Sequence, residues 1–202
     1  MDRAPIETPA DRPLTIRPNA SYKDVLAAPP GMNAELLGGT LYLQPRPRPR
    51  HARVEGRLAN RLIDPYEDGI GGPGGWWLLI EPDVFLGEDV VIPDLAGWRR
   101  ERMPDFPEAA IDLAPDWVCE ILSPSTRRFD LTLKRERYRR AGVAHLWLID
   151  PDARTLEAFA LDGGAWRLDG ALGDEADVSL APFEAVSFPL ATLFPPPLPS
   201  SG

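Results

Sequence analysis

The sequence is poor in cysteine and histidine, which argues against several kinds of site. Among its 202 residues, Cys119 is the only cysteine, and His51 and His145 are the only histidines. A lone cysteine cannot form a disulfide within the chain, and these three side chains are too few for a tetrahedral zinc site built from Cys and His. They leave open a cysteine hydrolase, in which Cys119 attacks with the help of His51 or His145.

Cys119 is poorly placed for that role. It lies in the middle of a predicted strand, between Val118 and Glu120. Thiols in strand interiors are usually inert parts of the core, and a neighbouring carboxylate does not lower the pKa of a thiol. The cysteine hydrolase therefore stays an alternative that requires Cys119 to be exposed and reactive.

Long apolar runs are also missing. No stretch approaches the ~20 apolar residues that a membrane-spanning helix needs. The segment 1–20 carries Asp2, Glu7 and Asp11 and has no apolar core, so it does not resemble a secretory signal. We expect a cytoplasmic protein with no membrane partner.

The chain lacks the basic balance of a general nucleic-acid-binding protein. Its net charge is −9 and its isoelectric point is about 4.8, whereas such domains are usually basic. Two stretches, 46–61 and 127–140, are nevertheless rich in arginine. Runs of charge are ordinarily solvated helix faces, but two basic stretches that meet around one groove would attract phosphate.

Proline and charge divide the chain into parts. We expect residues 1–20 to be a disordered arm, 21–194 a folded domain and 195–202 a disordered tail. Strands are predicted at 41–44, 76–81, 84–86, 88–98, 116–122 and 145–150, and a hairpin around Asp162-Gly163-Gly164. Helices are predicted from His51 to the break at Pro65, and over 130–141 with Asp130 as its cap and Gly142 at its end. This order predicts an α/β fold with a mixed central sheet flanked by helices, followed by C-terminal β-hairpins.

The predicted strand 116–122, DWVCEIL, carries a charge in an apolar setting. Alternation places residues 117, 119 and 121 on one face and 118, 120 and 122 on the other. Apart from Glu120 both faces are apolar, as in a central strand that is covered on both sides. A carboxylate there costs several kcal/mol unless it is paired or binds a metal. Glu120 is therefore either a partner of a buried arginine or part of a functional site.

Asp94 repeats this anomaly in the predicted strand 88–98. Val90, Ile92 and Asp94 share a face if the strand stays regular. Pro93 predicts a local bulge or an edge, where side chains are often re-aimed. The simpler alternative is an aspartate in a turn.

Lys134 is the third candidate. On the predicted helix it shares one stripe with Leu131 and Tyr138, which gives it a core-facing position. The alternative is a surface lysine whose stem lies along apolar neighbours.

Together these three residues form a chemically sensible set. Two carboxylates on neighbouring strands can hold Mg²⁺ or Mn²⁺ through oxygen, with water completing the coordination. Such a metal polarises a phosphoryl oxygen and lowers the pKa of a bound water. A nearby lysine can orient that water or stabilise the negative charge that develops.

The segments VVIPDLAGW and PDWVCEILSPSTRRFDLTLKRERYRRAGVAHLWLID resemble the Uma-type family of restriction-endonuclease-like proteins, a branch of the PD-(D/E)XK nuclease superfamily. The likeness extends over about residues 22–194, and its specific motif spans 90–150. It implies a restriction-endonuclease-like fold with Asp94 as the PD aspartate and Glu120 at the (D/E) position. It also implies supporting roles for His51, which opens the first helix, and for Glu35, before the first strand.

One position departs from the superfamily pattern. Two residues after Glu120, where the lysine of (D/E)XK would be, the chain has Leu122. The superfamily is known to move this lysine to a nearby helix, and Lys134 fits that arrangement. The resemblance thus implies an Mg²⁺- or Mn²⁺-dependent endonuclease that hydrolyses DNA. Since DNA substrates are often two-fold symmetric, a homodimer is an arrangement that would suit them. The alternative is a nuclease-fold binding module that no longer cleaves, which the acidic net charge favours.

Overall fold

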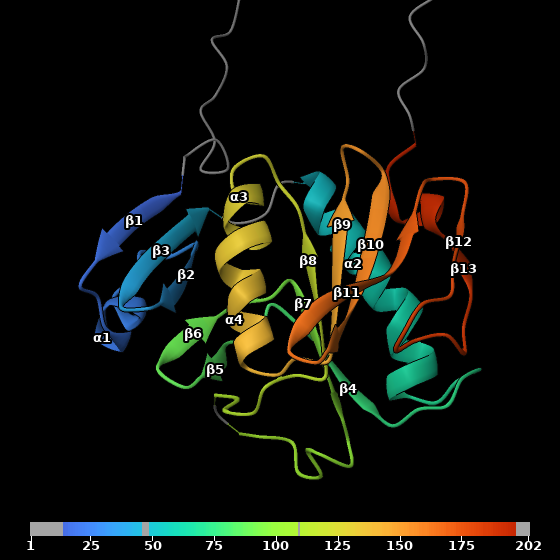
Figure 1. Ribbon diagram of the computed structural model, residues 1–202, viewed down its shortest axis with the longest axis horizontal. Coiled ribbons are helices and arrows are strands. Elements are labelled where there is room, and N and C mark those ends of the chain that lie inside the picture. Colours follow the sequence, from blue (N-terminus) through green and yellow to red (C-terminus); the bar gives the residue numbers. More distant parts are fainter. Residues whose placement is uncertain (1–13, 46–48, 109, 197–202) are drawn as a thin grey trace, which may run out of the picture.

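The computed structural model describes residues 14–45, 49–108 and 110–196. Its centre is a six-stranded sheet (Figure 1). In spatial order the strands are β11 (Ala165–Leu172), β10 (Thr155–Asp162), β9 (His145–Asp150), β8 (Trp117–Ile121), β7 (Leu95–Arg99) and β4 (Trp76–Ile80). Strands β8 and β9 run parallel, and the other neighbours are antiparallel. The sheet is therefore mixed, and β8, which carries Glu120, lies inside it.

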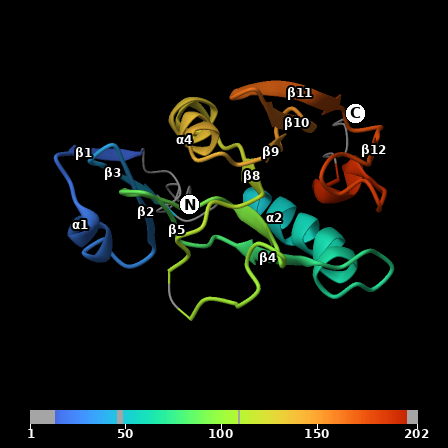
Figure 2. The ribbon, with the colours of Figure 1, turned by 60° about the horizontal axis from the view of Figure 1, so that its bottom comes forward.

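Helices cover both faces of this sheet. Helix α2 (Pro49–Leu62) lies on one face, and the continuous helical segment α3 (Arg127–Phe129), η3 (Asp130–Lys134) and α4 (Arg135–Arg140) lies on the other (Figures 1 and 2). Alternation along β8 assigns its side chains to these two layers. Trp117, Cys119 and Ile121 belong to the core beneath α2. Val118 and Leu122 belong to the core beneath α4, which confirms the predicted faces.

A second sheet stands beside the first, next to α4 (Figure 1). Its order is β1 (Thr15–Pro18), β3 (Thr40–Pro45), β2 (Met32–Leu37), β6 (Asp89–Val91) and β5 (Val84–Leu86), with the short helix α1 (Tyr22–Leu26) packed against it. Glycines 38 and 39 both have positive φ, 57° and 70°, and form the turn between β2 and β3. This sheet brings Glu35 of β2 close to the chain that leaves β6.

The prediction of one strand over 88–98 is wrong. The structure has two strands in different sheets, β6 and β7, separated by Ile92, Pro93 and Asp94. Pro93 has no N–H to donate and does not continue a ladder. The chain therefore passes from one sheet to the other at this point, and Asp94 lies at the crossing, directly before β7.

Two helix boundaries also differ from the prediction. The helix α2 does not stop at Pro65, because a π-helical turn, η2 (Ile63–Glu67), follows it. The second helix begins at Arg127, so Asp130 lies inside it, in αR geometry and buried, and does not cap it. Gly142, with φ 76°, follows the end of α4 as predicted.

The expected disorder of 1–20 is wrong for its last part. Strand β1 pairs with β3 in register from Thr15 with Leu43 to Pro18 with Thr40. Residues 1–13 and 197–202 lie outside the described residues, so the rest of the arm and most of the tail stay expectations. The predicted hairpin is confirmed as β10 and β11. Beyond it lie β12 (Asp177–Val178), β13 (Phe188–Pro189) and the 3₁₀ turn η4 (Leu190–Leu193). Within the described ranges no helix has the length and apolar character to cross a membrane.

Candidate functional site

Asp94 is held at the crossing by two donors. The backbone N–H of Ile121 donates to its Oδ2 at 2.6 Å, which fixes the carboxylate beside the end of β8. His51 Nε2, from the first turn of α2, lies 3.1 Å from the same oxygen. The Asp94 side chain is 15% exposed, so solvent reaches it. Asp94 thus joins α2, β7 and β8 while remaining accessible.

Glu120 lies at the adjoining position of β8, and it is fully engaged. Lys134 Nζ is 2.8 Å from its Oε1 and 3.0 Å from its Oε2. The hydroxyl of Tyr138, one turn after Lys134 on the helix, donates to Oε1. Glu120 and Lys134 are each only 2% exposed. The core-facing position that the helical stripe predicts for Lys134 is therefore what the structure shows.

Glu35 completes a network at the place where the chain changes sheets. Its Oε1 is 3.0 Å from Lys134 Nζ and accepts the N–H of Ile92 at 2.8 Å. Lys134 Nζ also donates to the carbonyl of Ile92 at 2.9 Å. Gln44 of β3 donates to the other oxygen of Glu35. Ile92 lies between β6 and β7. Its backbone N–H is bonded to Glu35 and its carbonyl to Lys134, so neither group is left without a partner.

Burial and charge shift the pKa values of this network. Burial alone would lower the pKa of Lys134, but the carboxylates of Glu120 and Glu35 raise it well above its ordinary value, so Lys134 is an ammonium. Burial raises the pKa of Glu120; Lys134 opposes that rise and the charge of Asp94 adds to it. The pKa of Glu120 is therefore raised well above its ordinary value even with Lys134 beside it, and a further cation would favour the ionised form.

A second group of side chains faces Asp94 from α2. His51 and Glu55 are one turn apart on the same buried face, 9% and 8% exposed. Burial would lower the pKa of His51, but Asp94 raises it above its ordinary value. Burial, with the charges of Asp94 and Glu81, raises the pKa of Glu55 to about 7. His51 Nδ1 and Glu55 Oε1 are buried atoms with no hydrogen-bond partner.

The residues at Asp94 fit a divalent cation held through few protein ligands. Asp94 reaches solvent, and Glu55 beside it has an unpartnered oxygen, and both are the hard oxygen donors that Mg²⁺ and Mn²⁺ prefer. Within the part of the chain that the structure describes, no three His, Cys, Asp or Glu side chains already stand together as a metal-binding group. Mg²⁺ commonly uses only one or two carboxylates and keeps water and substrate phosphate as its other ligands.

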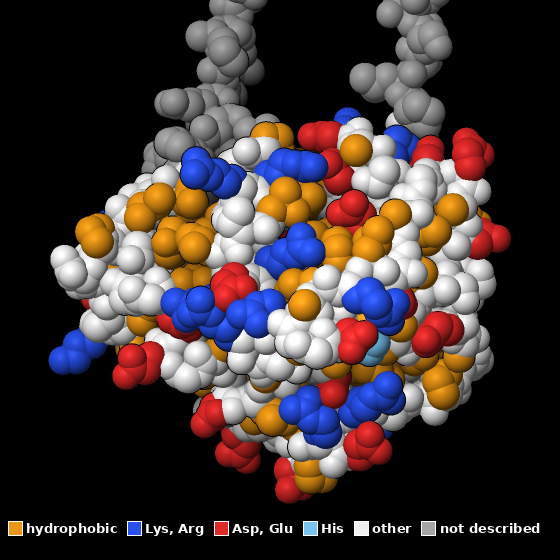
Figure 3. Space-filling model, viewed as in Figure 1, with side chains coloured by type: hydrophobic (Ala, Val, Ile, Leu, Met, Phe, Trp, Pro, Cys, Tyr) orange, Lys and Arg blue, Asp and Glu red, His pale blue; other side chains and the backbone are white. Residues whose placement is uncertain are grey.

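The site opens toward arginines at one end of the central sheet. A pocket of about 280 Å³ is lined by Arg50, His51, Leu122, Ser123, Pro124, Pro151 and Asp152. Arg50 of α2 pairs with Asp152 at 3.0 Å, and Arg127 of α3 pairs with Asp150. Arg50 and Arg127, one from each arginine-rich stretch, are thus paired with acids at the end of β9 and in the turn after it. Arginine and lysine are spread across this side of the molecule in Figure 3.

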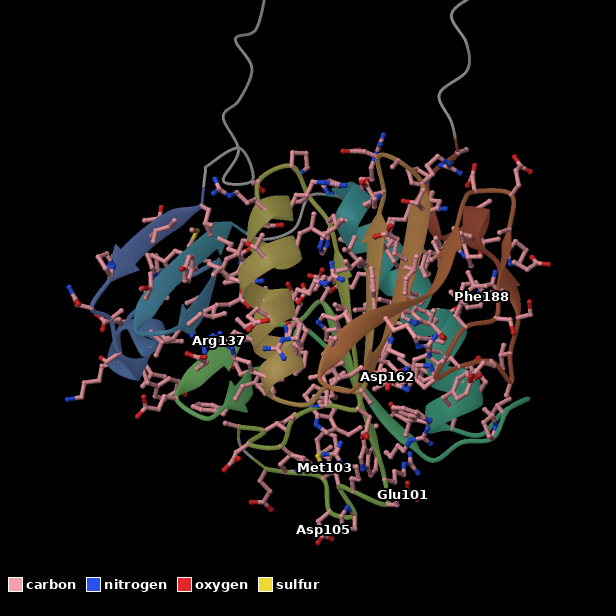
Figure 4. The ribbon with its side chains drawn as sticks, in the orientation of Figure 1. Glu101, Met103, Asp105, Arg137, Asp162 and Phe188 are labelled. Atoms are coloured by element: carbon pink, nitrogen blue, oxygen red, sulfur yellow. The ribbon has the colours of Figure 1, made fainter. Side chains whose placement is uncertain are left out.

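Other charges lie away from this opening. Arg137 extends from α4 toward β6, where it is 2.9 Å from Asp89 (Figure 4). Glu101 and Asp105 lie in the loop after β7, at the opposite end of the sheet from the start of α2 (Figures 1 and 4). The negative charge of this loop is therefore remote from the pocket at Arg50.

Cys119 does not support a cysteine hydrolase. Its side chain is 0% exposed in the core beneath α2, and burial raises the pKa of its thiol well above the ordinary value. A buried, protonated thiol does not attack a substrate.

Sequence reasoning missed two buried carboxylates of this region. Glu55 lies within the arginine-rich stretch 46–61 and was not among the predicted site residues. Its spacing from His51, Val54 and Leu58 places it on the buried stripe of α2, and that spacing was a usable signal. Asp130, taken for a helix cap, is 4% exposed, and burial raises its pKa to about 7 although Lys134 opposes the rise.

Comparisons with known proteins agree with this architecture. Residues 20–191 match the sequence profile of the Uma2 family, which is described as "Putative restriction endonuclease". A crystal structure of "a putative nuclease belonging to DUF820" from Anabaena variabilis ATCC 29413 superimposes with a TM-score of 0.68 at 21% identity, covering 86% of this chain and 97% of the other. At that identity the likeness concerns the fold, and it confirms the predicted fold class. No curated protein matches the chain in sequence.

Proposed function

The chain belongs to the Uma2 family, and from that membership together with its site we propose that it is a divalent-metal-dependent endonuclease that hydrolyses phosphodiester bonds in DNA. The observation that carries the proposal is the position of Asp94. The side chain of Asp94 is partly exposed directly before β7, where its carboxylate accepts the N–H of Ile121, the residue that follows Glu120, and is paired with His51. Several charged side chains are buried around it. Burying charge lowers the stability of the fold, and such groups are often found at functional sites.

Asp94 and Glu120 are the residues that would hold Mg²⁺ or Mn²⁺. When bound, such an ion polarises the phosphoryl group and lowers the pKa of a coordinated water. His51 keeps the Asp94 carboxylate oriented through Oδ2. Tyr138 and Lys134 hold Glu120, and the ammonium of Lys134 brings positive charge to the place where negative charge develops on phosphate.

The pocket beside His51 supports a nucleic-acid substrate. Arg50 lines this pocket, and its side chain remains half exposed, 52%, although it is paired with Asp152. Arginine presents a planar fork that suits phosphate. A negatively charged backbone can exchange with Asp152 for this arginine, which supports binding of a polynucleotide across the start of α2.

A nuclease-fold module that binds without cleaving is the second candidate. One observation favours it: both oxygens of Glu120 are already bonded to Lys134 and Tyr138. If Glu120 keeps these hydrogen bonds, only one of the two proposed metal-binding carboxylates, that of Asp94, is available to a metal ion. The acidic net charge of −9 also favours a module whose partner is not DNA.

A cleavage assay separates the two candidates. Supercoiled plasmid and labelled single- and double-stranded oligonucleotides are incubated with the protein in Mg²⁺, Mn²⁺ or EDTA. We expect nicking that requires the metal and that Asp94→Asn lowers at least 100-fold, while Asp105→Asn, in the distant loop, cuts as the wild type does. No cutting of any of these substrates, from a folded preparation, would favour the silent module.

A further inference from the structure

Glu55 is a buried acid whose burial nothing in the core explains. The residue is 8% exposed, and its Oε1 is out of contact with solvent and has no hydrogen-bond partner. A buried carboxyl oxygen without a partner loses its contact with water and gains no hydrogen bond in exchange, which is unfavourable. The neighbours of Glu55 on α2, Val54 and Leu58, pack into the core and offer it no donor. Such a group calls for an explanation, and a role in binding a ligand is one.

The surroundings of Glu55 are negatively charged. Asp94 and Glu81 both act on it electrostatically, and both repel its ionised form. Glu81 follows β4 with φ 46°, a left-handed conformation that is unusual for a residue with a side chain, and its N–H donates to the Asp94 carbonyl at 3.0 Å. Asn33 holds the carboxylate of Glu81 at 3.0 Å. The fold thus gathers acidic side chains at Asp94 and keeps one of them without a partner.

We propose that Glu55 supplies a further carboxylate ligand to the divalent cation that Asp94 holds, from the α2 side of the sheet. This inference rests on the proposed function, and it adds a residue that no motif pointed to. Glu55 has three rotatable bonds, and its unpartnered Oε1 is not tied down by a hydrogen bond. It can turn toward a cation at Asp94 at little cost, whereas Glu120 must first give up Lys134 and Tyr138.

The ligand is a hard divalent cation such as Mg²⁺ or Mn²⁺, because the donors are carboxylate oxygens and Cys119 is buried away from them. A cation at this place also relieves the repulsion between Asp94 and Glu55. In the alternative, Glu55 is a neutral carboxylic acid that fills space beneath α2. These two roles differ in one respect: only the first makes cation affinity depend on Glu55.

Calorimetric titration with Mn²⁺ alone, at pH 7.5 and without DNA, tests the proposal. Wild type, Glu55→Gln, Asp94→Asn and the exposed control Glu101→Gln are compared, with circular dichroism to show that each is folded. We expect Glu55→Gln to weaken Mn²⁺ binding at least 10-fold and Glu55→Asp to weaken it less, while Glu101→Gln binds as the wild type does. Gln keeps the shape of Glu55 and removes its charge, so a change in affinity reports the ligand role.

The outcomes separate this proposal from the one beneath it. Equal affinity of Glu55→Gln and wild type, with binding lost in Asp94→Asn, would overturn the assignment of Glu55 and leave the metal-dependent function in place. A wild-type protein that takes up no Mn²⁺ would overturn both. Weaker binding in Glu55→Gln and in the Glu101→Gln control alike would also count against a specific role for Glu55.

Discussion

Replacing Lys134 by Met is the perturbation whose cost the structure defines best. The ammonium is 2.8 Å from Glu120, 3.0 Å from Glu35 and 2.9 Å from the Ile92 carbonyl, in a place that is 3% exposed. Met keeps the length of the side chain and removes the charge. Two buried carboxyls then lose their counter-ion and the carbonyl its donor. Removing one partner of a buried ion pair costs about 3–5 kcal/mol, so we expect Lys134→Met to lower the free energy of unfolding by that amount.

Urea unfolding without metal, at pH 5 and pH 8, measures this loss. Lys23→Met is the matched control, because Lys23 is the other lysine of the sequence and is exposed. For a chain of this length, a loss of about 3–5 kcal/mol corresponds to a fall in Tm of about 6–20 °C. The loss should be smaller at pH 5, where protonation removes the stranded charges, and adding Glu120→Gln should recover part of it. If Lys134→Met is within about 1 kcal/mol of Lys23→Met at pH 8, the reasoning about this network is wrong.

Three further predictions concern single side chains. The pKa of Glu55 lies at about 7 in the folded protein, above its ordinary 4.5, so wild-type stability falls relative to Glu55→Gln as pH rises from 4.5 to 7. In metal-free urea unfolding the gap should reach up to about 3 kcal/mol at pH 8 and vanish below pH 4; a gap that does not change with pH would contradict it. Tyr138→Phe removes the hydrogen bond donated to Glu120 and should cost about 1.5–3 kcal/mol in the same assay, while an unchanged midpoint would show that the bond contributes nothing. Cys119 should react with a thiol reagent only after unfolding, and rapid labelling of the native protein would revive the cysteine hydrolase.

Local patterns in the sequence were enough to predict the elements on which the site stands. Alternation along 116–122 predicted which side chains lie on each face of β8. The prediction succeeded because successive side chains of a strand point to opposite faces and both faces of β8 pack against apolar cores. The helical stripe placed Lys134 in the core, and the structure buries it there. The roles of Asp94, Glu120, Lys134, His51 and Glu35 in catalysis stay predictions.

What the sequence could not provide was the pairing between distant segments. Pro93 indicated an irregularity, but not that β6 and β7 enter different sheets, because that depends on strands β2 and β8 far away in the chain. The link from Glu35 to Ile92 joins residues 57 positions apart and follows from the same crossing. Glu55 was missed for another reason. It lies among charged residues, which are usually exposed on a helix, although its spacing of four residues from His51 places it on the buried face of α2.

Binding of a divalent cation at Asp94 is the property on which the proposed function depends most. Anomalous diffraction from crystals soaked in Mn²⁺ tests it most directly, because the signal locates the ion without assuming its ligands. We expect a peak about 2.1–2.2 Å from a carboxylate oxygen of Asp94, in wild-type crystals and not in Asp94→Asn crystals. Crystals with no anomalous peak at Asp94 in saturating Mn²⁺, with and without a DNA oligonucleotide, would contradict the account and leave the silent module as the better description of this protein.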